Sequence, residues 1–490
     1  MSELAFITEY WRPILIIVNL IYIVTAIVVS ISIILDNRNP SKTISWIIIL
    51  FVLPFIGLII YFMIGQNYRK QKIFTKKGME DFRRIQSLSE KQLIELSSGV
   101  LLNDEKIRSK LHIISLLLKN GKALLTRKNR ATILNNGNEI FSSIISELRK
   151  AKEHIHLECY IIEDDMIGNQ IKNILIAKSL EGVKVRMIYD DVGSWKLSSR
   201  YLDQLRRAGV EVYPFMPVKF PFLANKVNYR NHRKTIVIDG RTGFVGGVNI
   251  ADRYIYGNKN IPFWRDTHLK IEGEAVNSLQ AVFLIDWYFV TGEELNEDLY
   301  FRKSNIKSSN LVQIISSGPD SDWASIMQSF FSAITTASNY IYIAVPYFIP
   351  NESILTALKT VSLSGIDVRI ILPARSDSYL AYYGTMSHAE ELMEAGINVY
   401  LYKKGFIHSK LVMVDDIFSS VGTANMDIRS FDDNFEVNAL IYDEKITNEL
   451  KQYFFEDLKE CEMLSYEEYK KRGFSRKFKE SVARLFSPLL

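Results

Sequence analysis

The chain of 490 residues is longer than one ordinary hydrophobic core requires, and its 48% apolar and 12% aromatic residues exclude a disordered protein. The formal net charge of +5 is too slight for this length to require a nucleic-acid partner. Residues 1–65 contain three basic and three acidic residues, so the positive excess lies in the remainder of the chain.

Two long apolar segments open the chain. Residues 14–35 contain no charge, and as a helix rising about 1.5 Å per residue they are long enough to span a bilayer. Residues 44–64 form a second uncharged segment, in which Pro54 and Gly57 are tolerated as they are in membrane helices. A polar turn, DNRNPSKT, joins the two segments. The pattern predicts a transmembrane helical hairpin within residues 1–65, and it fits neither a signal peptide nor a buried core helix.

Basic residues near the segment ends predict the orientation. Arg12 precedes the first segment, the turn carries only Arg38 and Lys42, and the second segment is followed by Arg69, Lys70, Lys72, Lys76 and Lys77. Because Lys and Arg collect on the cytoplasmic side, both termini and the body of the protein are expected in the cytoplasm, at the cell membrane. The two widely separated cysteines, Cys159 and Cys461, agree with reduced thiols in that compartment.

The remainder of the chain divides into a connector, two repeated halves and a tail. Residues 66–125 are rich in charge and helical in pattern, and we find no catalytic chemistry in them. Residues 126–300 and 301–465 repeat one order of strand, helix and strand, at 154–162, 170–180 and 182–190 in the first half and at 340–347, 353–363 and 365–373 in the second. This alternation predicts an α/β fold of two repeated halves, each with a sheet covered by helices.

One polar motif occurs in each half, in YRNHRKTIVIDGRTGFVGGVN (229–249) and in FIHSKLVMVDDIFSSVGTAN (406–425). The matched residues are His232, Lys234, Asp239, Gly246, Gly247 and Asn249 in the first copy and His408, Lys410, Asp415, Gly422, Thr423 and Asn425 in the second. Every pair is offset by 176 positions. Two copies in fixed register indicate two half-sites that form one active site.

The spacing within the motif has a physical meaning. The apolar runs 235–238 and 411–414 predict buried strands, and alternation along a strand makes each histidine point the same way as its lysine. Asp239 and Asp415 have the opposite parity at the strand ends, which suits structural carboxylates. The small residues are expected to let the backbone pass close to a ligand, to which Asn249 and Asn425 would donate an amide.

Lysine and asparagine around a histidine indicate phosphate chemistry with the histidine as reactant. Metal binding is the rival use of histidine, but a lysine two residues away repels a cation, and neither a His-x-x-x-His pattern nor a cysteine pair accompanies either motif. We therefore expect no metal and no other cofactor.

These motifs resemble the two HxKxxxxD motifs of the phospholipase D superfamily. Within it the chain is most similar to the bacterial cardiolipin synthases, through YRNHRK, residues 263–268, residues 317–320 and the paired apolar N-terminus. The resemblance covers nearly the whole chain and implies two phospholipase D-like halves that share one central active site. It implies catalytic roles for the histidine, lysine and aspartate of both motifs, namely His232, Lys234, Asp239, His408, Lys410 and Asp415. It also implies that Asp266 and Glu436 hydrogen-bond and orient the motif histidines.

The reaction that the resemblance implies is phosphatidyl transfer between two phosphatidylglycerol molecules, which gives cardiolipin and glycerol through a phosphohistidine. It assigns His232 as the nucleophile and His408 as the acid and base, but the local sequences are nearly alike and the roles can be exchanged. Water or serine as the acceptor would make the protein a phospholipase D or a phosphatidylserine synthase. A membrane-anchored nuclease and a non-catalytic scaffold are further alternatives, although the apolar N-terminus favours lipid over nucleic acid and complete motif sets argue against a scaffold.

The tail, residues 466–490, interleaves Lys and Arg with Phe, Val and Leu. This pattern predicts a basic amphipathic helix, which either lies on anionic lipid or docks on the body of the protein.

Overall fold

The computed structural model describes residues 3–35, 40–62, 80–97, 108, 110–218, 229–295 and 300–487. The chain divides into two compact units, Met1–Gln71 with Val218–Asn228, and Lys72–Pro217 with Tyr229–Leu490. The first unit contains the apolar N-terminal helices, and the second contains both copies of the repeated motif.

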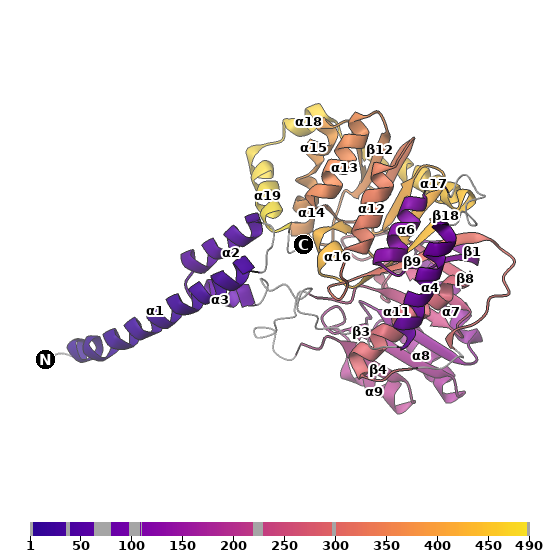
Figure 1. Ribbon diagram of the computed structural model, residues 1–490, viewed down its shortest axis with the longest axis horizontal. Coiled ribbons are helices and arrows are strands. Elements are labelled where there is room, and N and C mark those ends of the chain that lie inside the picture. Colours follow the sequence, from indigo (N-terminus) through magenta and orange to yellow (C-terminus); the bar gives the residue numbers. More distant parts are fainter. Residues whose placement is uncertain are drawn as a thin grey trace. The chain divides into compact units, whose positions relative to one another are not determined.

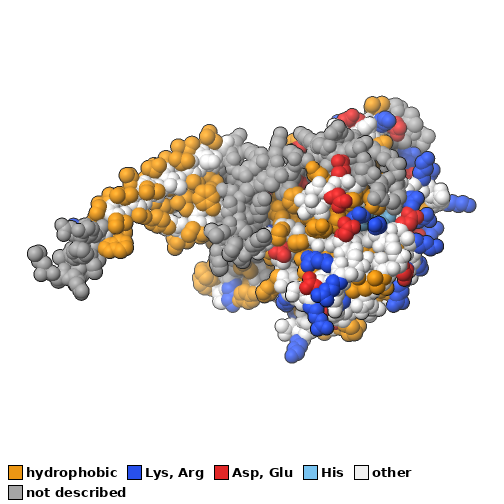
Figure 2. Space-filling view, turned by 90° about the horizontal axis from the view of Figure 1, so that it is seen from below, with side chains coloured by type: hydrophobic (Ala, Val, Ile, Leu, Met, Phe, Trp, Pro, Cys, Tyr) orange, Lys and Arg blue, Asp and Glu red, His pale blue; other side chains and the backbone are white. Residues whose placement is uncertain are grey.

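Helix α1 (Glu3–Leu35) is the principal element of the first unit (Figure 1). Its segment Trp11–Leu35 is long and apolar enough to cross a membrane. Hydrophobic side chains cover its described surface (Figure 2), and Ile16 and Leu35 are 67% and 77% exposed. An apolar surface of this extent is unfavourable in water and suits the interior of a bilayer.

The prediction of one continuous helix over residues 44–64 is wrong. Helix α2 (Pro40–Val52) ends before Pro54, and a separate short helix, α3 (Ile56–Ile60), follows. Proline lacks the N–H that continues a helix and its ring collides with the preceding turn, while Phe55 adopts a left-handed backbone with φ of 62°. A side chain on Gly57 would collide with the carbonyl of Ile49, so glycine is required where the chain bends.

Helices α1 and α2 pack against each other. The Tyr22 hydroxyl of α1 donates a hydrogen bond to the Leu50 carbonyl of α2, and Val29 and Ile33 are buried with Leu50 in a small apolar cluster. Residues 36–39 of the predicted turn and the basic residues Arg69, Lys70, Lys72, Lys76 and Lys77 lie outside the described residues.

The second unit is built on one sheet, which has fifteen strands within the described residues. From its centre outward the first half contributes β1 (Leu125–Asn135), β8 (Thr267–Gly273), β6 (Thr242–Gly246), β5 (Lys234–Ile238), β2 (His154–Cys159), β3 (Lys184–Asp190) and β4 (Glu211–Phe215). The second half contributes β9 (Asn310–Ser317), β18 (Glu436–Tyr442), β16 (Phe418–Gly422), β15 (Leu411–Val414), β10 (Tyr340–Ala344), β12 (Asp367–Pro373), β13 (Asn398–Tyr402) and β19 (Cys461–Met463). Strands β1 and β9 pair antiparallel at the centre, so the same strand order runs outward on both sides. This arrangement confirms the two repeated halves.

Helices cover both faces of the sheet, which confirms the mixed α/β class. One face is packed by α11 (Ala275–Thr291) and α17 (Glu444–Lys459). The other face is packed by α7 (Asn136–Lys150), α8 (Met166–Leu180) and α9 (Ser199–Arg207) in the first half and by α12 (Ser325–Thr335) and α13 (Glu352–Leu363) in the second (Figure 1). Because both faces are covered, the motif strand β5 is buried at every residue and reads as a continuous apolar run.

The predicted connector contains α4 (Glu80–Ser97) and α6 (Leu111–Asn120), while residues 63–79, 98–107 and 109 lie outside the described residues. The second half ends with α14 (Tyr379–Met386), α15 (Ala389–Glu394), α18 (Tyr466–Lys470) and α19 (Phe474–Leu485) arranged at one side. Cys159 and Cys461 are both free thiols.

Candidate active site

The segments that carry the two histidines cross between the halves. In the sheet, β5 and β15 are separated by β16, β18, β9, β1, β8 and β6. The segment before β5 nevertheless pairs with the segment before β18, because the N–H of His232 donates to the Phe435 carbonyl at 2.9 Å. The equivalent crossing joins β14 (Phe406–Ile407) to β7 (Trp264–Arg265), and the N–H of His408 donates to the Arg265 carbonyl at 2.7 Å. Each histidine is therefore held beside the acidic residue of the opposite half.

Both predicted acidic residues contact a motif histidine, and both contacts cross the halves. Nδ1 of His232 lies 2.9 and 3.0 Å from the two carboxylate oxygens of Glu436. Nδ1 of His408 lies 2.7 Å from Oδ2 of Asp266. With Nδ1 directed at a carboxylate, the reactive nitrogen of each ring is Nε2.

Glu436 and His232 form a pair of an anion and a neutral imidazole. Burial favours the neutral carboxylic acid, but the neighbouring His232 and Lys234 and a hydrogen bond from the Thr423 hydroxyl outweigh it, and the pKa of Glu436 is lowered. Burial lowers the pKa of the His232 imidazole to about 4 despite the attraction of Glu436. At neutral pH the Nδ1–H of His232 is therefore a donor to Glu436, and Nε2 carries a lone pair.

The second half-site differs in its protonation. Burial lowers the pKa of His408 well below its ordinary value, and the nearby ammonium groups of Lys410 and Lys234 lower it further. Burial also raises the pKa of Asp266 to about 6, despite the charge of Lys410. The carboxyl group beside His408 thus has a raised pKa, whereas the pKa of Glu436 beside His232 is lowered.

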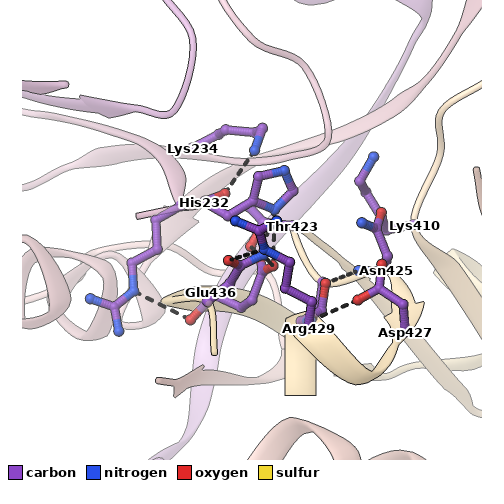
Figure 3. A network of polar contacts seen from close by, with 12 residues as sticks. His232, Lys234, Lys410, Thr423, Asn425, Asp427, Arg429 and Glu436 are labelled. Atoms are coloured by element: carbon purple, nitrogen blue, oxygen red, sulfur yellow. Dashed lines mark hydrogen bonds and ion pairs between the residues drawn. The ribbon is translucent and has the colours of Figure 1, made fainter. Parts of the chain in front are cut away.

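The two lysines occupy equivalent positions. Nζ of Lys234 donates to the His232 carbonyl at 2.7 Å, and Nζ of Lys410 donates to the His408 carbonyl at 2.7 Å while lying 3.0 Å from Nε2 of that ring. Figure 3 shows Lys234 and Lys410 on either side of the His232 imidazole. Burial lowers the pKa of Lys234 to about 8 and that of Lys410 to about 7. Because a buried ammonium group is stabilised by a nearby anion, both lysines favour the binding of a negatively charged group.

The two motif aspartates lie at the far ends of their strands. The Asp239 carboxylate accepts hydrogen bonds from the N–H groups of Lys152, Glu153 and His154 at 2.8 to 2.9 Å, and so fixes the start of β2. Asp415 does the same for β10, accepting from the N–H of Asn339 at 2.8 Å, and it also accepts from Nζ of Lys110 at 3.2 Å. Neither carboxylate contacts a motif histidine, which agrees with a structural role for both, and the catalytic role that the resemblance implied stays a prediction. Their parity had indicated this structural role.

The predicted phosphate ligands differ in their surroundings. Oδ1 of Asn249 accepts from the N–H of Ile161 at 3.1 Å, and its Nδ2 donates to the Tyr254 hydroxyl at 2.5 Å, which leaves one amide hydrogen. Asn425 is buried between Lys410 and Asp427 (Figure 3), and its Oδ1 has no hydrogen-bond partner among the described residues. The unpartnered atom of Asn425 is an acceptor, and its side chain hydrogen-bonds the Asp427 carboxylate, so in both half-sites part of the amide is already bonded within the protein.

The small residues of the motifs meet protein side chains where a ligand was expected. A Cβ on Gly247 would collide with the carboxylate of Asp266, and a Cβ on Gly246 would collide with the ring of His268. In the second copy a Cβ on Gly422 would collide with Asn438. The glycines therefore let the side chains of Asp266, His268 and Asn438 pack against the motif backbone, and the close approach to a ligand stays a prediction.

Two arginines near the half-sites were not identified as site residues from the sequence. Arg253 on α10 (Arg253–Tyr256) and Arg429 on α16 (Ile428–Asp432) each follow a motif asparagine by four residues, so they share the offset of 176 that could have revealed them. Arg253 pairs with Glu163 at 3.0 Å and lies over the Tyr254 ring, which is 5.5 Å from the ring of His408. Nε of Arg429 donates to Asn434 at 3.3 Å, close to Glu436 (Figure 3). One guanidinium thus stands near each half-site.

A buried polar cluster supports His232 from behind, and no sequence signal had singled it out. Arg233 pairs with Asp286 of α11, and its Nε donates to the Glu436 carbonyl at 3.3 Å. Asn231 donates to Glu158, whose pKa is raised well above its ordinary value by burial and by Asp286. The chain on both sides of His232 is therefore anchored. Among the described residues, no cluster of His, Cys, Asp and Glu could hold a metal ion.

Comparisons with known proteins agree with this geometry. Residues 144–287 and 330–458 match the family model described as the phospholipase D-like domain of cardiolipin synthase, and residues 14–66 match the N-terminal model of the phospholipase D and nuclease group. The cardiolipin synthase of Geobacillus sp. strain WCH70 is 48% identical over 461 residues, which cover 93% of this chain and 90% of that one. The cardiolipin synthase of Geobacillus thermodenitrificans is 44% identical over 485 residues, with coverages of 98% and 96%.

A solved structure provides an independent comparison of the fold. The crystal structure of phosphatidylserine synthase from Haemophilus influenzae superposes with a TM-score of 0.59 at 16% identity, covering 79% of this chain and all of that one. At this identity the likeness concerns the fold alone.

Proposed function

The chain belongs to the cardiolipin synthase family of phospholipase D-like phosphatidyltransferases, and on that premise we propose that its two half-sites move a phosphatidyl group from one phosphatidylglycerol to the glycerol hydroxyl of another. The observation that carries the proposal is the crossed contact of each imidazole Nδ1 with a carboxylate from the other half. It gives two oriented imidazoles in one buried, positively charged site, which is what a double displacement at phosphorus requires.

In the first step, Nε2 of His232 attacks the phosphorus of the donor, a nitrogen–phosphorus bond forms, and the bond from phosphorus to the glycerol oxygen breaks. His408, protonated, gives its proton to that oxygen, and glycerol leaves. The imidazole of His408 is neutral in the free protein, because its pKa is lowered. The negative charge of a bound phosphodiester would raise this pKa, so that the imidazole binds a proton in the complex.

In the second step, His408 removes the proton from the glycerol hydroxyl of the second phosphatidylglycerol. That oxygen attacks phosphorus, the nitrogen–phosphorus bond breaks, and His232 returns as the neutral imidazole. Lys234, Lys410 and the amides of Asn249 and Asn425 would stabilise charge on the non-bridging oxygens in both steps. These groups supply the electrophilic stabilisation without a metal.

His232 is the better nucleophile of the pair. Its partner Glu436 has a lowered pKa and accepts hydrogen bonds from Thr423 and Asn434, so a fixed anion stabilises the cationic phosphohistidine. Burial raises the pKa of Asp266 to about 6, so at neutral pH it is mainly a carboxylate, which orients His408 and stabilises the imidazolium form that the acid requires.

We also propose a role for each segment of the chain. Residues 1–65 anchor the protein in the cell membrane by two crossings, with the body and both termini cytoplasmic, and residues 66–125 connect this anchor to the halves 126–300 and 301–465. The exposed apolar surface of α1 and the packing of α2 on it support the two crossings, the second being a helix broken at Pro54. Anchoring keeps the site beside its two-tailed substrate and away from nucleic acid.

The test is an assay of the full chain reconstituted with phosphatidylglycerol. Cardiolipin and free glycerol in equal amounts are expected, and His232→Ala and His408→Ala should each abolish turnover because both rings serve one phosphorus atom. His112→Ala, an exposed histidine of α6, is the control and should retain full activity. Phosphatidic acid alone would indicate a phospholipase D, DNA cleavage without a lipid product would indicate a nuclease, and half the activity in each variant would indicate two independent sites.

A further inference from the structure

The C-terminal helix α19 is attached to the body by its charged side. Glu480 at the middle of the helix is 1% exposed, and its carboxylate accepts hydrogen bonds from the Tyr469 hydroxyl at 2.8 Å, from Nε of Arg472 at 2.7 Å and from Nε of Arg476 at 3.0 Å. Arg472 also pairs with Glu390 of α15. A buried carboxylate with this many donors fixes the helix in one orientation.

The helix also contacts α14, where Nζ of Lys479 lies over the rings of Tyr379 and Tyr383 at 5.9 and 5.7 Å. Lys479 itself is exposed, and the buried side chains of α19 are Glu480 and Ala483, each 1% exposed. This burial of a carboxylate is the reverse of an ordinary surface helix, whose apolar side faces the core.

The outer face of α19 carries the large apolar side chains. Phe474, Phe478 and Leu485 are 83%, 59% and 79% exposed, and the first two rings stack at 6.1 Å between centroids. On α14, which contacts α19, Tyr379 is 66% exposed and Leu380 is 38% exposed. This apolar face is held outward by the ionic attachment beneath it, so it cannot turn inward without breaking the Glu480 cluster.

Basic residues surround the apolar face. From residue 466 to residue 487 there are seven basic residues (Lys470, Lys471, Arg472, Arg476, Lys477, Lys479 and Arg484) against three acidic ones (Glu467, Glu468 and Glu480). Glu480 is paired with Arg472 and Arg476, and Glu391 is paired with Arg484, so the outward positive charge comes from the four lysines, against Glu467 and Glu468. A row of exposed aromatic side chains with lysines beside it is the composition of a helix that lies in the interface of an anionic membrane.

We propose that the outer face of α19, with Tyr379 and Leu380, docks on an anionic lipid bilayer and inserts Phe474 and Phe478 among the headgroups. The positive charge selects an anionic lipid surface over a neutral one, and the stacked phenyl rings supply the apolar contact. This docking surface is separate from the phosphoryl-transfer chemistry and does not depend on it. Because the face is fixed to α14 and α15 of the second half, it would set that half against the membrane surface.

The position of the face is tested with a nitroxide label at Phe478→Cys in a Cys461→Ser background, in the full chain reconstituted into vesicles. In vesicles containing phosphatidylglycerol the label should become more accessible to oxygen than to a water-soluble nickel complex, and in phosphatidylcholine vesicles this preference should fall. A label at Leu180→Cys, 74% exposed at the end of α8, is the control and should remain in water in both. A water-exposed label at Phe478→Cys in both lipids would overturn the proposal. Spin–spin broadening between labels would also overturn it, because it would show that a second copy of the chain covers the outer face of α19.

The functional consequence is tested with Phe474→Ser combined with Phe478→Ser, both exposed positions whose change leaves the core intact. On phosphatidylglycerol in vesicles, turnover is expected to fall about tenfold, while turnover on short-chain phosphatidylglycerol in mixed micelles should be unchanged. Leu180→Ser should behave as the unsubstituted chain in both assays. An equal loss of turnover in vesicles and in micelles would contradict the docking role. If the unsubstituted chain forms no cardiolipin, the proposed function is overturned, but the label experiment still tests the docking surface.

Discussion

The carboxylates that face the two histidines give the sharpest test of which ring is the nucleophile. Glu436→Gln removes the anion that stabilises the cationic form of His232, and Asp266→Asn removes the carboxyl partner of His408. Each change should lower turnover by about 10² to 10⁴-fold, the usual contribution of general acid–base groups. Rapid quenching with radiolabelled phosphatidylglycerol should find slow formation of the phosphoenzyme in Glu436→Gln, whereas in Asp266→Asn the phosphoenzyme that forms should persist, because His408 is also the base of the second step. The reverse pattern would exchange the roles of the two histidines.

The lowered pKa values of the lysines predict the pH dependence. Lys410 and Lys234, with pKa values of about 7 and about 8, carry the charge that binds phosphate only below these values, so kcat/KM should fall as the pH rises through this range. On the acid side kcat/KM should fall toward pH 4 as the His232 imidazole, with a pKa of about 4, gains a proton and loses its lone pair. In the profile of kcat the alkaline limb should lie higher, because a bound phosphate anion raises the lysine pKa values. Lys234→Arg is the control. Because arginine keeps its charge, only the decrease in kcat/KM that follows the deprotonation of Lys410 should remain. An alkaline decrease identical in Lys234→Arg and in the unsubstituted chain would contradict the assignment.

At the scale of elements, the segment that follows β6 passes close to Asp266, and adding one methyl group there tests whether this close approach is required. In Gly247→Ala the new Cβ would collide with the Asp266 carboxylate, which would move away from Nδ1 of His408. Turnover should fall by at least about tenfold, since a small displacement at a reacting group is costly. Gly473→Ala is the matched control, because a Cβ there meets open space, and it should change neither activity nor melting temperature. Full activity in Gly247→Ala would mean that Asp266 has no part in positioning His408.

Most helices and strands of the second unit can be predicted from local sequence patterns, but the arrangement of the active site cannot. The motif strands were predictable because β-branched runs such as residues 235–238 are buried on both faces, and α13 starts within one residue of its predicted position because Asn351 caps it. The crossing of the halves depends on short pairings such as β7 with β14, which link residues far apart in sequence and leave no periodic signal. For the same reason Asp266 and Glu436 were identified as orienting residues without their partners being assigned. Pro54 is the opposite case, where the local steric signal was visible and was given too little weight.

At the scale of the whole molecule, the number of membrane crossings decides on which side the N-terminus lies. Six basic residues flank the outer ends of the two apolar segments and two lie in the turn, so two crossings place Ser2 and the body together in the cytoplasm and Asn37 outside. Helix α2 by itself is about 20 Å long at 1.5 Å per residue, and α3 bends back toward it, so a second crossing requires the chain to straighten at Pro54 in the bilayer. In intact cells, a membrane-impermeant maleimide should label Asn37→Cys and should label Ser2→Cys only after permeabilisation, with Cys461 replaced by serine in both. Labelling of Ser2→Cys from outside would mean that α1 alone crosses, and the segment from Pro40 to Ile60 would then lie on the cytoplasmic surface, where its apolar side chains would dip into one leaflet only.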